Sequence, residues 1–446
     1  MEPLREIDVG ELMQDRRIGR LHVLTFCLCM AILFVDGLDY SSVNVAAPAL
    51  LRAFGAERSA MGFMFSMGFT GILIGSVIFG IVGDKYGRKT GAVLGVLAYS
   101  VPALLSVFAT SFNELTIYRL FTGLGIGGVI PNIVALLSET APKRYRVTFV
   151  MAVFIGYSMG NAAIGQVAAW LIPEYGWQIV FLVAGISGLG LSAVLILFLP
   201  ESIPFLAATK PESPRLRALV ARMAPELAIG PQTRFTFRRP AKETTFSLSL
   251  LFDGYRRVAT PIIWLAFLAE SMTYLTLSAW FVVLLEGVGL SVMQAALAYS
   301  YAQVGAIVAI LMVARLFDRF GPVVSVFSAC TAVAAIIALG LPGLTPVSIT
   351  AIAIVALACG SATHQSLIGM VGNFYPTIVR GNGVGYATGM GRIGAILGPA
   401  FAGYLLTRLP IPNVLIFIAV PDLVVAVACL GLARFAREAR ARQPVA

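Results

Sequence analysis

Long runs of apolar residues, separated by shorter polar segments, recur along the whole chain. Leu21 to Phe34, Gly91 to Ala109 and Ile179 to Leu199 are examples. With its flanks each run reaches about 20 residues, the length that a helix needs to cross a bilayer. The pattern predicts an all-α membrane protein with twelve transmembrane helices, near residues 21–46, 58–81, 91–110, 114–138, 147–171, 176–199, 259–285, 293–314, 322–341, 346–373, 381–407 and 412–434.

The composition supports the same class of protein. Hydrophobic residues make up 58% of the chain and charged residues 12%, and the mean hydropathy is +0.88. In soluble domains about 25% of the residues are charged. We therefore expect a multi-pass protein of the cell inner (cytoplasmic) membrane, with the lipid bilayer as its surroundings.

The net charge of +10 raises the question of a nucleic-acid partner, and the placement of the basic residues answers it. Of the 32 Lys and Arg residues, 27 lie in the termini and in alternate loops, whereas only Arg52, Arg58 and Arg408 lie in the opposite loops. Loops rich in Lys and Arg stay in the cytoplasm. The asymmetry predicts that both termini are cytoplasmic, and we expect no nucleic-acid partner.

The cysteines and the N-terminus add no further chemistry. All five cysteines lie in predicted spans without metal-ligand spacing, which predicts reduced packing residues and no metal site. Acidic residues stand among the basic ones at the N-terminus and no small-residue cleavage site follows, so we expect no signal peptide. The sequence contains no catalytic constellation or phosphate loop, and we expect neither an enzyme nor a cofactor.

The chain contains an internal repeat, in which the offset that leads from Asp84 to Asp318 recurs along both halves. The stretch 84–87 matches 318–321, Arg146 matches Arg380, and Gly160 matches Gly394. A register shared over this distance predicts that a unit of six helices was duplicated. The expected parts are an N-terminal segment at 1–20, a six-helix bundle at 21–199, a cytoplasmic central loop at 200–258, a second, pseudo-symmetric six-helix bundle at 259–434 and a tail at 435–446.

Two parallel six-helix halves resemble the major facilitator transporters, whose substrate site lies at the bilayer midplane between the halves. The stretch from Gly80 to Lys89 resembles the signature loop of that family. The resemblance implies that this loop is a conformational latch, and Arg88 is expected to pair across the interface between the halves. The alternative is a charged turn that only follows the distribution of positive loops. The expected latch and its second copy consist of Gly80, Asp84, Gly87, Arg88, Asp318 and Gly321.

In the fourth predicted span, Arg119 is followed by several glycines, which resembles a second motif of the family. Its place near the outer end of the span leaves two roles open: snorkelling or bonding to nearby carbonyls, and a part in proton movement. Arg146 and Arg380 are expected to belong to the conformational machinery. The fifth span lacks the Gly-Pro pair that similar antiporters carry, which favours symport.

Within the superfamily the chain resembles the aromatic acid:proton symporters of the 4-hydroxybenzoate and benzoate type, over nearly its whole length. The resemblance rests on Asp36-Gly37-Leu38-Asp39, on the stretch 374–381 and on the stretch 391–399. It implies a monomeric secondary transporter that imports a small aromatic acid anion together with protons, by alternating access. The alternatives are a carrier or exporter of another small organic acid, and a sensor of the same fold that does not transport.

Three ionisable residues lie near the middle of predicted spans, where each charge costs about 2.5–3.5 kcal/mol by insertion scales. Asp36 and Asp39 share one face of the first span, and their mutual repulsion favours reversible proton binding. Arg392 needs an anion, either the substrate carboxylate or one of the two aspartates. The resemblance implies that all three are required, and the alternative is an internal salt bridge between the halves.

The second half offers further polar candidates. Glu270 occupies the repeat position of Asp36 and is expected to bind a proton or to pair at a gate. His364, beside Gln365 in the tenth span, is expected to hydrogen-bond a substrate hydroxyl or to relay protons, with packing as the alternative.

Aromatic residues after Glu270 are candidates for stacking on a substrate ring, although ordinary helix packing is the alternative for each. Asp422 in the last span has no role that the sequence suggests. The predicted proton-coupling residues are Asp36, Asp39 and Glu270, and the predicted substrate-binding residues are Asp36, Asp39, Arg392, His364, Gln365, Tyr274 and Trp280.

Overall fold

The computed structural model of the chain describes residues 6–14, 18–224, 233–237, 248–321, 323–375 and 377–441. The side chain of Asp318, expected in the second copy of the latch, lies outside the described residues. The protein is almost entirely helical. Lipid offers the backbone no hydrogen-bond partner, so a chain of this composition satisfies its peptide groups within helices.

Two sets of long helices correspond to the two halves of the repeat. The first set is α2 (Arg20–Phe54), α3 (Arg58–Tyr86), α4 (Arg88–Ser106), α5 (Phe112–Thr140), α6 (Arg146–Tyr175) and α7 (Gln178–Phe198). The second set is α10 (Arg256–Gly287), α11 (Val292–Phe320), α12 (Val323–Ala338), α13 (Pro346–Phe374), α14 (Thr377–Arg408) and α15 (Ile411–Ala441).

Ten helices in the described part of the chain are long and apolar enough to cross a membrane. The helix α12 is apolar but shorter, and α14 is not among the ten. The helical membrane fold is thus confirmed, whereas the count of twelve spans stays a prediction.

Polar residues at the helix ends set where the helices begin and stop. Ser291 and Gln294 form a capping box that opens α11, and Thr345 caps α13 just before Pro346. The helix α2 ends at Gly55, whose φ of 58° lies in the left-handed region that favours glycine.

The N-terminal segment and the central loop form a small unit of their own. Strand β1 (Glu6–Asp8) pairs in parallel with β2 (Arg234–Thr236), and the unit also contains α1 (Val9–Gln14), α8 (Ile203–Thr209) and α9 (Pro214–Met223). Its core is apolar and buried, and includes Val9, Leu216, Val220 and Phe235. Part of the expected central loop thus packs against the N-terminal segment. Two short 3-10 helices, Lys143–Tyr145 and Leu248–Phe252, complete the elements.

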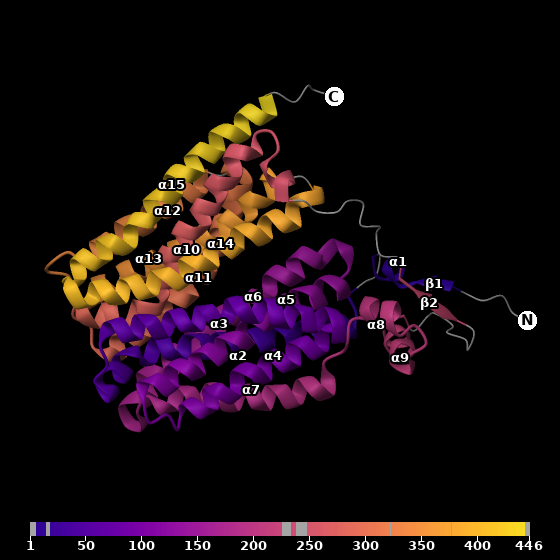
Figure 1. Cartoon of the computed structure of the whole chain (residues 1–446), viewed down its shortest axis with the longest axis horizontal. Coiled ribbons are helices and arrows are strands. Elements are labelled where there is room, and N and C mark those ends of the chain that lie inside the picture. The colour runs from indigo at the N-terminus through magenta and orange to yellow at the C-terminus, as the bar shows by residue number, and fades with distance from the viewer. Residues whose placement is uncertain are drawn as a thin grey trace, which may run out of the picture.

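Figure 1 shows α2–α7 and α10–α15 as two bundles that lie against each other. We call the end of the molecule that carries α1, α8 and α9 the α8 end, and the opposite end, where Arg52 meets Glu286, the Arg52 end. The bundles are tilted, so that they lie close together at the Arg52 end and diverge toward the α8 end (Figure 1).

The contacts between the bundles follow the repeat. Ser66 of α3 donates a hydrogen bond to the carbonyl oxygen of Ile396 in α14 at 2.5 Å, and Ser300 of α11 donates one to Ala162 in α6 at 2.8 Å. Positions 66 and 300 are separated by the repeat offset, and so are positions 162 and 396. The same bond therefore forms twice, once in each direction across the interface. Gly62 lets α3 and α14 approach closely, since a Cβ there would meet the carbonyl of Pro399.

Candidate functional site

Four ionisable side chains lie at a similar depth in the two bundles. Asp36, Glu270, His364 and Arg392 stand near the middle of their helices, at similar distances from the Arg52 end. At 1.5 Å per residue their depth from that end is about 24–27 Å. Because the helices are 29 to 35 residues long, these groups form a layer near the middle of the molecule.

The N-terminal bundle buries two carboxyl groups with one arginine. Asp36 and Asp39 are completely buried, and neither oxygen of the Asp36 carboxyl has a hydrogen-bond partner among the described residues. Asp39 Oδ1 lies 3.7 Å from Arg119 Nη1. Arg119 also donates to Ser106 Oγ at 3.3 Å and lies over the ring of Phe181.

These contacts settle the position of Arg119. Its side chain is 5% exposed, so it does not snorkel to the surface, and the expected part in proton movement stays a prediction. It also lines a cavity between α2, α3 and α5, together with Tyr40, Asn44 and Thr122. Asp39 therefore has a counterion within its own bundle.

Arg392 does not pair with either aspartate, and that alternative of the sequence analysis is wrong for this structure. The guanidinium of Arg392 donates a hydrogen bond from Nη1 to Ser76 Oγ in α3. The reason is geometric: α14 packs against α3, whereas Arg119 reaches Asp39 from α5. Arg392 is half-buried and makes no ion pair among the described residues. It remains available to an anion that enters between the bundles.

The C-terminal bundle holds a second buried cluster. Glu270 Oε2 lies 2.6 Å from His364 Nδ1, and the ring of His364 stacks on Tyr274, with 5.7 Å between the centroids. The Glu270 side chain is 1% exposed, whereas that of His364 is 25% exposed. Asp422 is buried within electrostatic reach of Glu270, and its carboxyl has no hydrogen-bond partner in the described part of the chain. Gln365 is half-buried next to His364.

The two predicted aromatic candidates differ in surroundings. Trp280 is completely buried, donates from Nε1 to the carbonyl of Pro399 at 3.1 Å and packs on Phe65 of the other bundle. It belongs to the contact between the bundles, so in this structure it does not face a ligand, contrary to the sequence-based expectation. Tyr274 is partly exposed, and its repeat counterpart, Tyr40, packs on Tyr157 with 5.8 Å between the centroids.

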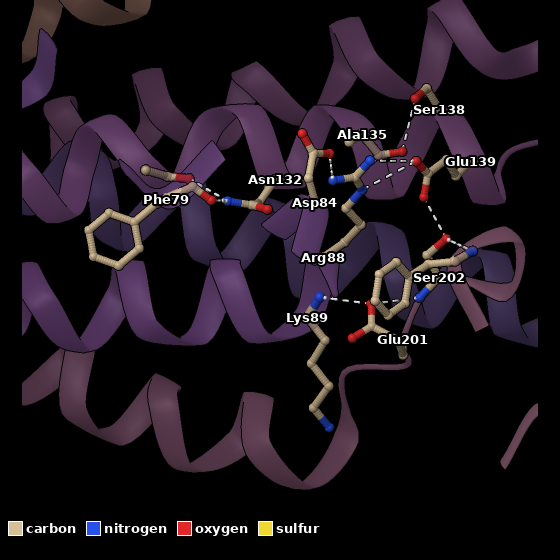
Figure 2. Close-up of polar contacts among 12 residues, drawn as sticks. Phe79, Asp84, Arg88, Lys89, Asn132, Ala135, Ser138, Glu139, Glu201 and Ser202 are labelled. Atoms are coloured by element: carbon tan, nitrogen blue, oxygen red, sulfur yellow. Dashed lines mark hydrogen bonds and ion pairs between the residues drawn. The ribbon is translucent and has the colours of Figure 1, made fainter. Parts of the chain in front are cut away.

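Asp84 and Arg88 of the expected latch belong to a polar network within the N-terminal half at the α8 end (Figure 2). Arg88 pairs with Asp84 and donates to Glu139 Oε1 from Nε at 3.3 Å and from Nη2 at 3.2 Å. Glu139 Oε2 accepts a hydrogen bond from Ser202 Oγ at 2.5 Å. The expectation that Arg88 pairs across the interface is therefore wrong in this structure, because its described ion partners are Asp84, one turn away, and Glu139 at the end of α5.

The start of the central loop completes this network. Glu201 Oε1 accepts hydrogen bonds from the backbone N–H groups of Lys89, at 3.0 Å, and Ser202, at 2.9 Å. Gly87 has a φ of 109°, and a Cβ at this position would collide with the Glu201 carboxylate. Burial raises the pKa of Glu201 above its usual value, while the N–H donors oppose that shift.

Several residues of this network were not found from the sequence. Glu139 stands in the last turn of α5, where a negative charge is unfavourable next to the helix dipole. This unfavourable position is the feature of the sequence that could have indicated a basic partner for Glu139. Asn132 donates from Nδ2 to the carbonyls of Phe79, at 3.0 Å, and Gly128, at 2.8 Å, and so ties α5 to α3 (Figure 2). Glu201 gave no local signal, because its partners are distant in sequence.

The remaining predicted residues lie at the surface of the α8 end or have no close neighbour. Arg146 begins α6 and is exposed, and Arg380 is exposed and donates from Nε to the carbonyl of Tyr375 at 3.3 Å. No atom would lie within 4 Å of a Cβ at Gly80 or Gly321, and Gly321 ends α11 with a φ of 67°.

Comparison with known proteins identifies the relatives of the chain. Residues 29–377 and 305–446 match the model of the Major Facilitator Superfamily. The gallate transporter of Pseudomonas putida is 33% identical over 430 residues, which cover 95% of this chain and 95% of that protein. The 4-hydroxybenzoate transporter PcaK of Pseudomonas aeruginosa is 32% identical and covers 90% of each chain. The benzoate transport protein of Acinetobacter baylyi is 29% identical, over 93% of this chain and 90% of that protein.

Solved structures share the fold at low sequence identity. A bacterial homologue of the human lysosomal transporter Spinster, in an inward-facing and occupied conformation, has a TM-score of 0.68 and 15% identity, over 94% of this chain and 98% of that one. A mutant of the nucleoside transporter NupG has a TM-score of 0.68 and 16% identity, over 93% of this chain and 100% of that one.

Proposed function

The chain belongs to the major facilitator superfamily of membrane transporters, which are not enzymes, and we propose that it imports a small aromatic carboxylate by proton symport through alternating access. The relatives named for gallate, 4-hydroxybenzoate and benzoate support the substrate class. We place the protein in the cytoplasmic membrane, as a monomer. Its termini and the α8 end are assigned to the cytoplasm, because 27 of its 32 Lys and Arg residues lie in the termini and in the loops on that side.

The observation that carries the proposal is the buried carboxyl of Asp36, which has no described partner at mid-depth of the bundle. An ionised carboxylate without a partner in such a place costs several kcal/mol, and the protonated form avoids that cost. Asp39 differs, because Arg119 lies beside it. We assign Asp36 as the site that carries the proton, and the Asp39–Arg119 pair as the group that responds to its charge.

Arg392 is assigned to the substrate carboxylate. Its guanidinium is held only by the neutral Ser76 hydroxyl among the described contacts, and its planar fork suits a carboxylate. The Arg392–Ser76 bond is also the bond between the two bundles that lies nearest the α8 end among those described. A substrate anion at this position would neutralise Arg392 and engage both halves at once. Glu270 is assigned as a second proton-binding group, and His364, Gln365 and Tyr274 as further contacts of the substrate.

The latch is assigned to the conformational cycle. In this structure the bundles are joined at the Arg52 end, and the latch makes its contacts within one half. Closing the α8 end would bring the C-terminal bundle, with Asp318 and Gly321, toward Arg88. Arg146 and Arg380, which begin or flank repeat-related helices at the same end, are assigned to this movement.

Uptake into proteoliposomes tests the function directly. We expect labelled hydroxybenzoates, benzoate and gallate to accumulate under an inward proton gradient, and an uncoupler to stop the accumulation. The Asp36→Asn variant should still exchange substrate across the membrane but should not accumulate it, since the amide cannot release a proton. Accumulation by Asp36→Asn at the wild-type level, with equal amounts of protein in the membrane, contradicts the assignment. Binding of these acids without any uptake would instead indicate a sensor.

A further inference from the structure

His364 presents one ring nitrogen to a buried acid and keeps the other free. Nδ1 lies 2.6 Å from Glu270 Oε2. Nε2 has no hydrogen bond among the described residues, and it is not one of the completely buried polar atoms without a partner. The side chain is 25% exposed although it stands in the middle of α13. Nε2 is therefore the part of this pair that a ligand between the bundles can reach.

The carboxylate decides what Nε2 offers. In the state in which Glu270 is ionised and the imidazole is neutral, Glu270 accepts from Nδ1–H, and this bond selects the tautomer in which Nε2 carries a lone pair. The stack on Tyr274, with an interplanar angle of 30°, holds the ring plane. The pair therefore positions a hydrogen-bond acceptor.

Tyr274, which stacks on His364, is in turn near aromatic rings of the N-terminal bundle. Tyr40 and Tyr157 pack together in the N-terminal bundle, and Tyr40 is within electrostatic reach of Tyr274. Tyr40, Tyr157 and Tyr274 are all partly exposed. Rings at this spacing favour edge-to-face or offset contacts with another ring. A planar aromatic ligand beside His364 would thus lie next to the ring of Tyr274.

The charges near His364 decide which end of an aromatic acid it binds. Glu270 is in direct contact with it, and Asp422 is buried within electrostatic reach of Glu270. An anionic carboxylate of the substrate would be repelled by an ionised Glu270, whereas a neutral hydroxyl that donates a hydrogen bond would not. The positive group assigned to the carboxylate, Arg392, lies on a different helix.

We propose that His364 Nε2 accepts a hydrogen bond from a ring hydroxyl of the substrate, so that the carrier selects hydroxylated aromatic acids over unsubstituted ones. This inference rests on the proposed function and names the specificity residue within it. Glu270 acts through His364 by orienting the ring.

The test compares substrates that differ only in hydrogen-bonding capacity. Uptake of labelled 4-hydroxybenzoate into proteoliposomes is competed with benzoate, 3-hydroxybenzoate, 4-hydroxybenzoate and 4-methoxybenzoate. Methoxybenzoate keeps the oxygen but cannot donate, so the wild type should prefer at least one of the hydroxylated acids over methoxybenzoate and benzoate by about tenfold, as for one hydrogen bond with a buried partner.

Two substitutions at His364 separate the acceptor from the shape of the ring. His364→Phe keeps a flat ring that can stack on Tyr274 but has no acceptor, and we expect the ratio of uptake of the hydroxylated acid to that of benzoate to fall to about one. His364→Gln supplies an amide oxygen and should restore part of the preference. Ser361→Ala is the matched control, because Ser361 lies one turn away in α13 and bonds only the carbonyl of Ala358 among the described residues.

The outcomes distinguish the inference from the proposed function. A His364→Phe carrier that keeps the hydroxyl preference overturns the inference, and so does one that loses benzoate and hydroxybenzoate equally. A wild type that transports no aromatic acid overturns the proposed function instead. Equal amounts of each variant in the membrane and the same elution profile in detergent are required for the comparison.

Discussion

The two ends of the molecule hold their polar contacts differently. At the Arg52 end the contacts join the two bundles: Arg52 meets Glu286 at 2.6 Å, and Ser66 and Ser300 each donate to the opposite bundle. At the α8 end the strongest network, centred on Arg88, stays within the N-terminal half and the start of the central loop. In this structure the described bonds at the Arg52 end connect the two bundles, whereas the described bonds around Arg88 do not.

The difference also concerns symmetry. The serine bonds at the Arg52 end are related by the repeat, and Arg52 and Glu286 themselves occupy repeat-related positions. At the α8 end the repeated residues, Asp84 and Asp318, stand in a symmetric sequence context, but the partners Glu139 and Glu201 of the first copy are joined to it only by folding. The repeat-related contacts join the two bundles at the Arg52 end, and the contacts without a repeat counterpart connect helices of the N-terminal half with the start of the central loop.

The largest effect is expected from breaking the network around Arg88 at the α8 end. Arg88→Ala leaves Glu139, which is 26% exposed, without its ion pair and frees Asp84. We expect uptake to fall about tenfold or more, because unpaired and partly buried charges destabilise the network. Transport and thermal stability in detergent are measured. Lys85→Ala, in the same turn and without an ion pair among the described residues, is the control, and an equal loss in both variants contradicts the assignment.

A smaller effect is expected from breaking the symmetric bonds at the Arg52 end. Ser66→Ala removes one bond between the bundles, worth about 1 kcal/mol, and should shift the equilibrium toward the state open at this end by about fivefold. Ser300→Ala removes two such bonds, because Ser300 Oγ also accepts from Gln166 Nε2 at 3.1 Å, and should shift this equilibrium further. The fraction of that state is measured from distances between spin labels near residues 52 and 286.

The two serine variants also test each other. The repeat counterpart of Gln166 is Ala400, which has no donor, so Ser300→Ala should have the larger effect, and the double variant should approach the product of the two single effects. Ser138→Ala, which removes a bond within α5, serves as the control. A larger effect of Ser66→Ala than of Ser300→Ala would contradict this order.

A pH effect at the α8 end should be smaller still. Burial raises the pKa of Glu201, so the docked state of the loop binds the proton more tightly than the undocked state. Docking of the loop should therefore weaken as the pH rises from the ordinary pKa of a glutamate through the raised pKa of Glu201. Limited proteolysis of the central loop between pH 4 and 8 measures this. Glu201→Gln should remove the dependence, Glu212→Gln, at an exposed position, should keep it, and a wild type without pH dependence contradicts the prediction.

The smallest effect is expected for the ion pair at the Arg52 end. Arg52 and Glu286 are 57% and 31% exposed, and pairs in such positions contribute about 0–1 kcal/mol and are screened by salt. Arg52→Glu should change uptake less than about fivefold, only at low ionic strength, and the swap with Glu286→Arg should restore it. A tenfold loss that persists at high salt would show that this pair, and not the serine bonds, closes the end.

The sequence reached further into the fold than into the contacts of the site. The apolar runs and the repeat offset predicted the helical bundles, and the burial of Asp36, Asp39 and Glu270 follows from their places in those runs. The partner of Asp39 was missed, since Arg119 lies three spans further along the chain and its own span does not reveal which neighbour it faces. Trp280 was predicted to bind the substrate, because the sequence does not distinguish a tryptophan that stacks on a ligand from one that packs against another helix, as Trp280 does here.

By itself the sequence determined the membrane class, the duplicated architecture and the set of charges that lie at mid-depth, because hydrophobic length and periodic register act locally along the chain. Only the tertiary structure decided which charges meet. Asp39 has Arg119, and not Arg392, as its counterion, and Glu270 pairs with His364. Glu201 of the central loop accepts a hydrogen bond from the backbone N–H of Lys89, next to Arg88. Such pairings depend on how helices far apart in sequence are rotated and packed against each other, and the sequence of a single span does not specify this rotation or packing.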